Sequence, residues 1–125
     1  MPPTPVIFFR DRDGTVPVLE WLQELRRRRP RAFAKCVVRI ERLADLGHEL
    51  RRPEADFLRD GIHELRARDG TVQYRILYFF HARSAAVLAV ATTKEGAVPK
   101  AEIARAVERK QAFERNPSAH TYTEH

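Results

Sequence analysis

Residues 60–80 read DGIHELRARDGTVQYRILYFF, and this stretch decides the fold. Two runs with the composition of β-strands, residues 62–68 and 72–79, flank the dipeptide Asp69-Gly70, which is typical of a tight hairpin turn. A third run, residues 85–93, is almost entirely apolar, as expected for a strand that is covered on both faces. The sequence therefore predicts three consecutive strands of an antiparallel sheet.

Helical patterns precede these strands. A short apolar strand at residues 6–9 and a turn lead to a helix that starts at Pro17, ends in a run of arginines and is stopped by Pro30. A second helix follows directly and reaches a glycine cap at Gly47. Because the break between them is so short, we expect the two helices to pack as an antiparallel hairpin.

The remaining segments complete the predicted order. Residues 48–59 are polar and are predicted to be a linker, and Pro99 opens a last helix that Asn116-Pro117 ends. The order β-α-α-β-β-β-α predicts an α+β fold, in which an antiparallel sheet packs against the helical hairpin and the C-terminal helix. We expect a single domain over residues 1–116 and a flexible C-terminal tail over residues 117–125.

Composition narrows the class of protein. The chain has 125 residues, 23 Lys and Arg against 17 Asp and Glu, and a formal net charge of +6. Such a charge favours nucleic acid, an anionic membrane surface or an acidic protein as the partner.

The single cysteine, Cys36, excludes an internal disulfide, and its apolar helical position predicts a buried, inert thiol. No apolar run approaches the ~20 residues of a membrane span, and no signal peptide is visible, so we expect a cytoplasmic protein with no membrane contact.

Cations on the strands are the candidate site. Strand alternation places Glu64, Arg66 and Arg68 on one face, Arg75 lies across the hairpin, and Lys94 follows the third strand. A cluster of fixed positive charge suits a phosphodiester, because guanidinium donors match two phosphate oxygens and offset charge that develops at phosphorus. The alternative is a solvated sheet face on which Glu64 pairs with an arginine. On the first interpretation, Arg66, Arg75 and Lys94 are the catalytic cations and the ligand is RNA.

Further basic and aromatic side chains are candidates for RNA contact. Arginines gather at the end of the first helix and in the polar linker, where helix-end charge and solvation are the alternative explanation. The predicted RNA-binding residues are Arg68, Tyr74, Arg26, Arg27, Arg28, Arg29, Arg51 and Arg52. Histidine is a residue type suited to acid–base work, so His63 and His81 are candidates, but a lone strand histidine is more often structural. There is no glycine-rich phosphate loop and no Cys/His set with metal-ligand spacing, so we predict no cofactor and no metal.

Three motifs carry a family resemblance: LxDGIxELR at residues 58–66, YRILYFF at residues 74–80 and PxxEIxxA at residues 99–106. Together they resemble the phage-derived, HigB-like branch of the RelE/ParE toxin superfamily, over about residues 6–113. The resemblance implies the toxin of a type II toxin–antitoxin system, a metal-independent endoribonuclease that cuts mRNA on the translating ribosome. It also implies a cognate antitoxin, of a helix-turn-helix, HigA-like kind.

The resemblance further implies roles for single residues. Arg66 and Arg75 map to the family's phosphate-binding and transition-state-stabilising cations, and Lys94 occupies the place of the basic pair after the last strand. The implied reaction is attack of the ribose 2′-hydroxyl on the adjacent phosphorus, which gives a 2′,3′-cyclic phosphate and a 5′-hydroxyl.

The chain departs from the family pattern after the last strand. The family usually carries Phe-x-Lys-Lys-Thr-x-Lys-x-Pro there, whereas this chain has Ala91, Thr93 and Ala97 in place of the aromatic and two of the lysines. The loss of these lysines favours a second hypothesis, in which the chain is a non-enzymatic ParE-like gyrase inhibitor or a degenerate toxin that only binds its antitoxin. The retained arginines favour the endoribonuclease.

Overall fold

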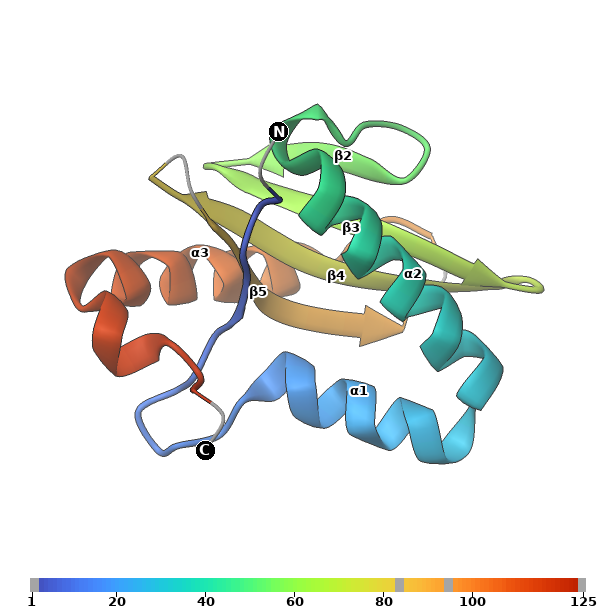
Figure 1. Ribbon diagram of the computed structural model, residues 1–125, viewed down its shortest axis with the longest axis horizontal. Helices are drawn as coiled ribbons and strands as arrows, with labels where there is room; N and C mark the ends of the chain where they lie inside the picture. The colour runs from blue at the N-terminus through green and yellow to red at the C-terminus, as the bar shows by residue number, and fades with distance from the viewer. Residues whose placement is uncertain (1–2, 83–84, 94–95, 124–125) are drawn as a thin grey trace.

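The computed structural model describes residues 3–82, 85–93 and 96–123. Within these residues the chain forms a five-stranded sheet of order β1-β5-β4-β3-β2, with α1 and α2 on one face and α3 on the other (Figure 1). Strand β1 runs parallel to β5, and the other neighbours are antiparallel. The elements are β1 (Val6–Phe8), α1 (Pro17–Arg28), α2 (Pro30–Leu46), η1 (Gly47–Glu49), β2 (Ala55–Arg59), β3 (Ile62–Asp69), β4 (Val72–His81), β5 (Ala85–Thr93), α3 (Lys100–Arg115) and η2 (Pro117–His120).

The two helices before the sheet form as the sequence predicts. Pro17 and Pro30 each occupy the first turn of a helix, where the missing N–H has no intrahelical partner to lose, and only Arg29 separates α1 from α2. The apolar stripes of both helices bury against the sheet, and Cys36 is 1% exposed, which confirms its predicted place in the core. Burial raises the pKa of the Cys36 thiol to about 12.

The opposite face of the sheet carries a second core. Ala106 and Phe113 of α3 pack with Phe79 of β4 and Val87 of β5. Residues 87–90 are therefore buried from both sides, which confirms the covered strand that the apolar run predicted.

The predicted linker contains a strand, so the expected β-α-α-β-β-β-α order lacks one element. Strand β2 pairs with the first half of β3, from Ala55 opposite Leu65 to Phe57 opposite His63. Asp60 and Gly61 make the turn between the two strands and both have positive φ, of 52° and 79°. The prediction of a linker was wrong because an edge strand pairs on one side only and alternates exposed with covered residues, so it shows no apolar run.

The predicted flexible tail is packed over its described part. Residues 117–120 form η2, and the ring of His120 stacks on Phe9 at 5.1 Å between centroids. His120 Nδ1 lies 2.8 Å from the carbonyl oxygen of Arg10, to which it donates, and the amide of Tyr122 donates to Phe8. This buried aromatic and these bonds join residues 117–123 to the end of β1, a packing that the sequence did not indicate.

Candidate functional site

A row of alternating charges crosses the sheet on the face that carries α3. Its members, called the charged row below, are Arg75 of β4, Glu64 and Arg66 of β3, Asp56 of β2, and Arg52 from the turn before β2. The register puts Arg66 directly opposite Arg75, and Glu64 directly opposite Asp56. Directly opposed residues of like charge repel each other, so the row is stabilised by ion pairs between residues of opposite charge that are not directly opposite.

Those contacts join each arginine to a carboxylate. Glu64 accepts a bond from Nε of Arg66 through Oε1, and its Oε2 lies 3.7 Å from Nε of Arg75. The next carboxylate, Asp56, receives two arginines on one oxygen: Oδ2 lies 3.2 Å from Nη2 of Arg66 and 2.9 Å from Nη2 of Arg52. The hydrogen bond from Arg52 is the main reason that the pKa of Asp56 lies below its ordinary value.

Burial along the row is graded. The Glu64 side chain is 4% exposed, that of Arg75 is 11% exposed and that of Arg66 is 32% exposed. A ligand that approached this face would meet Arg66 first, with the less exposed Arg75 and Glu64 behind it. Charges held at this depth act through a medium less polarisable than water, so an anion that reached them would be bound more strongly than at the open surface.

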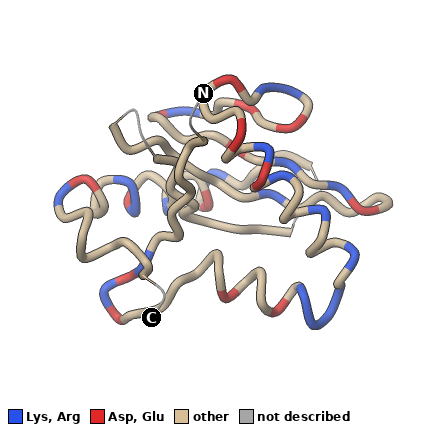
Figure 2. Tube along the Cα trace, in the orientation of Figure 1, with Lys and Arg blue, Asp and Glu red and all other residues tan. Residues whose placement is uncertain are grey.

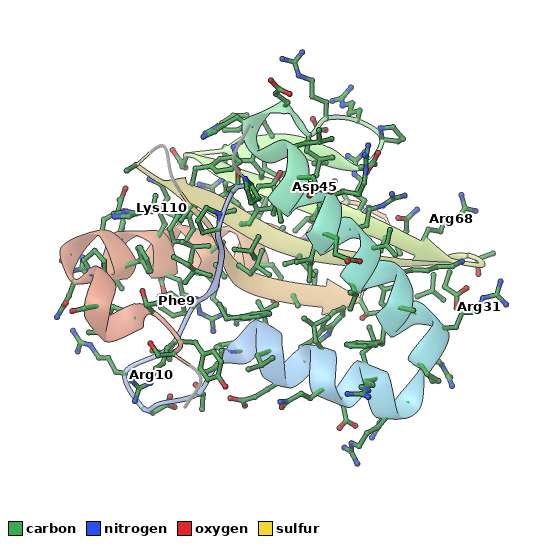
Figure 3. The ribbon with its side chains drawn as sticks, in the orientation of Figure 1. Phe9, Arg10, Arg31, Asp45, Arg68 and Lys110 are labelled. Atoms are coloured by element: carbon green, nitrogen blue, oxygen red, sulfur yellow. The ribbon has the colours of Figure 1, made fainter. Side chains whose placement is uncertain are left out.

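Arg68 does not share this row, although the strand pattern placed it there. Its Nε donates to the carbonyl of Gly70, 2.8 Å away in the hairpin turn. Figure 3 shows the side chain beside Arg31 at the hairpin end of the molecule, where Arg68, Arg31 and Lys35 line a groove. Near the end of a hairpin a long side chain can reach back to the turn, and the alternation of strand residues then no longer fixes the position of its charge.

The arginines at the end of α1 form a separate basic end. Arg28 and Arg29 line a groove with Tyr74 and Thr93, next to the Arg75–Thr92 pair but on the opposite face of the sheet. The ring of Tyr74 is only 6% exposed, which leaves little of it for contact with a base. Of the other predicted contacts here, Arg26 lies over the ring of Phe33, and Arg27 pairs with Glu24.

Arg51 and Arg52 lie at the β2 edge, away from the end of α1, and Figure 2 shows the two basic regions at different ends of the molecule. Arg52 joins the charged row through Asp56. Lys94 lies outside the described residues, so its predicted place near Arg75 has no structural counterpart here.

The two carboxylates of the row, Glu64 and Asp56, were not among the residues predicted to bind or cleave RNA. Strand alternation did place Glu64 beside Arg66, and the pairing of Glu64 with an arginine was the alternative interpretation. Asp56 gave no signal, because its strand was not predicted.

Within residues 3–82, 85–93 and 96–123, no group of three His, Cys, Asp or Glu residues could hold a metal ion. In the same part of the chain, no helix combines the length and the apolar character that crossing a membrane requires.

A mixed five-stranded sheet in the described residues, with a helix pair on one face and a C-terminal helix on the other, agrees with the RelE-like α+β fold. Residues 20–111 match the family described as phage-derived protein Gp49-like (DUF891), and the chain belongs to that family. The family is part of the RelE/HigB-like toxin group and is associated with toxin–antitoxin systems, which implies an antitoxin partner. No match was found among curated proteins.

Proposed function

We propose that this chain is the toxin of a type II toxin–antitoxin system and cleaves mRNA on the translating ribosome without a metal ion. Family membership supports the toxin. The observation that carries the activity is the cross-strand pair of Arg66 and Arg75, one partly open and one almost buried, with Glu64 between them.

In this mechanism the scissile phosphate approaches Arg66 and takes over guanidinium donors from the carboxylates. The ribose 2′-hydroxyl attacks phosphorus, the P–O5′ bond breaks, and the products carry a 2′,3′-cyclic phosphate and a 5′-hydroxyl. Arg66 and Arg75 offset the charge that grows on the equatorial oxygens, which is where fixed donors accelerate a reaction most. Glu64 is a positioning residue, and Lys94 helps to move protons between the attacking and leaving oxygens.

The proposed partners follow from charge and from the reaction. The basic end of α1 and the arginines at the β2 edge contact RNA phosphates of the mRNA and the ribosome, in the cytoplasm. A helix-turn-helix, HigA-like antitoxin meets the +6 chain through an acidic segment and covers the cationic face or blocks access to the ribosome.

One observation favours a second candidate. Both carboxylates of the charged row already neutralise the arginines that would bind phosphate, so the row also satisfies itself without a ligand. A degenerate toxin that only binds its antitoxin, or a ParE-like gyrase inhibitor, has no need of a free cationic face.

Induction of the chain in cells without antitoxin separates these candidates. The endoribonuclease stops protein synthesis and leaves cuts within translated mRNAs, and Arg66→Ala abolishes both effects. Arg105→Ala is the matched control, because Arg105 is an exposed arginine in an ion pair with Glu102 on α3. DNA breaks with intact mRNA would identify a gyrase inhibitor instead. A folded chain that binds its antitoxin but never arrests growth would identify a degenerate toxin.

A further inference from the structure

The edge of the sheet beside β2 contains a hollow that the proposed mechanism does not use. Its volume is about 410 Å3, and its lining includes His48, Arg51, Phe57 and His63. Phe57 is 57% exposed and, with Val38 at 51%, makes up the exposed large hydrophobic side chains of the described residues. A single exposed phenyl ring is not unusual in itself, but this one lines a hollow together with arginines, where a ligand that covered the ring would gain from its burial.

Aromatic rings line this hollow and pack against further rings behind it. His63 stacks on Tyr78 with centroids 5.2 Å apart and planes 18° apart, and Phe57 meets His63 edge-on at 5.2 Å. His48 stacks on Phe80 at 3.6 Å. Burial is the main cause that lowers the pKa of His63, with the nearby His48 contributing, and this shift favours the uncharged ring. Packed aromatic rings of this kind form a surface on which a flat ring can stack.

Cations border the same hollow and connect it to the charged row. Within the described part of the chain, the guanidinium of Arg51 has no hydrogen-bond or ion-pair partner. Arg52 also lines the hollow, and it contacts the same oxygen of Asp56 that Arg66 contacts. Phe57 and His63 face the side of the sheet that carries α2, whereas the charged row lies on the side that carries α3, so the hollow and the row meet only at the β2 edge, through Arg52 and Asp56. A strand of RNA that passed around this edge would contact both.

We propose that this hollow is a nucleotide subsite, in which Phe57 stacks on the base of a nucleotide next to the scissile phosphate and Arg51 binds that nucleotide's own phosphate. The ligand class is single-stranded RNA, because an exposed ring beside unpaired positive charge offers stacking and phosphate binding together. A protein partner would not respond to the removal of an RNA base, so the test below separates a protein contact from an RNA contact at Phe57. This subsite rests on the proposed cleavage of mRNA and adds a cause of sequence or register preference to it.

The test compares Phe57→Ala with a base deleted from the substrate. Short synthetic mRNAs, each lacking the base of one nucleotide within three positions of the cut, are translated in extract with the full-length chain, and cleavage is followed by primer extension. On intact mRNA, Phe57→Ala lowers kcat/KM by about 5- to 150-fold, chiefly through KM, as the loss of one base–aromatic stack predicts. Phe57→Tyr retains the ring and the activity. Val38→Ala removes the other exposed hydrophobic side chain and changes nothing.

The decisive result is the combination. At one position the abasic mRNA is cut less well by the wild-type chain, and Phe57→Ala costs nothing further on that mRNA, because both changes remove the same contact. An undiminished effect of Phe57→Ala on every abasic mRNA would overturn the subsite and indicate a protein or ribosomal contact. Wild-type cleavage by Phe57→Ala on intact mRNA would overturn it as well, and would leave the proposed function standing. Failure of the wild-type chain to cut any mRNA would overturn the proposed function and this subsite together.

Discussion

Replacement of Glu64 by glutamine tests the structural basis of the charged row. Glu64→Gln preserves the shape of the side chain and an oxygen acceptor but removes the negative charge between Arg66 and Arg75. These two arginines lie directly opposite each other, and the carboxylate that contacts both is 4% exposed. Removal of one partner from a buried ion pair costs about 3–5 kcal/mol, and we expect the lower end, about 3 kcal/mol, because Arg66 is 32% exposed and water screens part of its charge.

Urea unfolding at pH 7, followed by the fluorescence of the single tryptophan, Trp21, measures this loss. Glu102→Gln is the matched control, since its partner Arg105 is 51% exposed and such surface pairs contribute about 0–1 kcal/mol. The double variant Glu64→Gln/Arg75→Gln should recover part of the stability, because it removes a buried cation that the single change leaves uncompensated. A Glu64→Gln protein as stable as Glu102→Gln, or strict additivity in the double variant, would refute the coupling along the row.

Other expected outcomes concern the core and two titratable groups. Leu65→Ala, at a side chain that is 1% exposed, should lower the free energy of unfolding by about 2–5 kcal/mol through a cavity, as urea unfolding would show; a loss under 1 kcal/mol would contradict the packing. Cys36, with a thiol pKa of about 12, should resist a thiol reagent at pH 8 until the chain is unfolded, so fast labelling of the native protein would contradict its burial. Because burial lowers the pKa of His63 from its ordinary 6.5, the unfolded chain binds the proton more tightly. The stability contributed by this group is therefore complete above about pH 6.5 and declines as the pH falls below it. Unfolding free energies at pH 7.5 and pH 5.5 should show this decline, and His63→Gln should reduce it; an identical pH dependence in the variant would contradict the assignment.

Much of the fold could be predicted because local signals agreed with each other. Asp69-Gly70 marked the place of the hairpin between β3 and β4, although the turn itself is made by Gly70 and Thr71, and the apolar run at residues 85–93 fitted a strand with helices on both faces. Strand β2 escaped prediction because only one side of it is paired, although Asp60-Gly61 is the same kind of turn signal as Asp69-Gly70. The packing of residues 117–123 could not be foreseen either, since it depends on the ring of Phe9, which is more than a hundred residues away in the chain.

The candidate site could be predicted only in part. Strand alternation indicated that Arg66 and Arg75 share a face if the register of the hairpin permits, and the structure, in which Asp69 pairs with Val72, places the two arginines directly opposite each other. The contact of Asp56 with two arginines required the missing strand and was therefore out of reach. Strand alternation also failed to predict the position of the Arg68 charge, because its guanidinium group turns back to the carbonyl of Gly70 instead of joining the row.

The central claim, that the arginine pair cleaves RNA, is tested most directly at Arg75. The measurement is the rate of mRNA cleavage in a translating extract, followed by primer extension on a defined message, for the wild-type chain, Arg75→Ala and Arg75→Lys. Arg115→Ala, at an exposed arginine at the end of α3, is the control, and urea unfolding confirms that each variant is folded. We predict that Arg75→Ala loses on the order of 10²–10³-fold in rate, as expected for a donor that stabilises transition-state charge. Arg75→Lys should recover only part of this loss, because a point charge does not reproduce the guanidinium fork. Cleavage at the wild-type rate by a folded Arg75→Ala protein would contradict the claim.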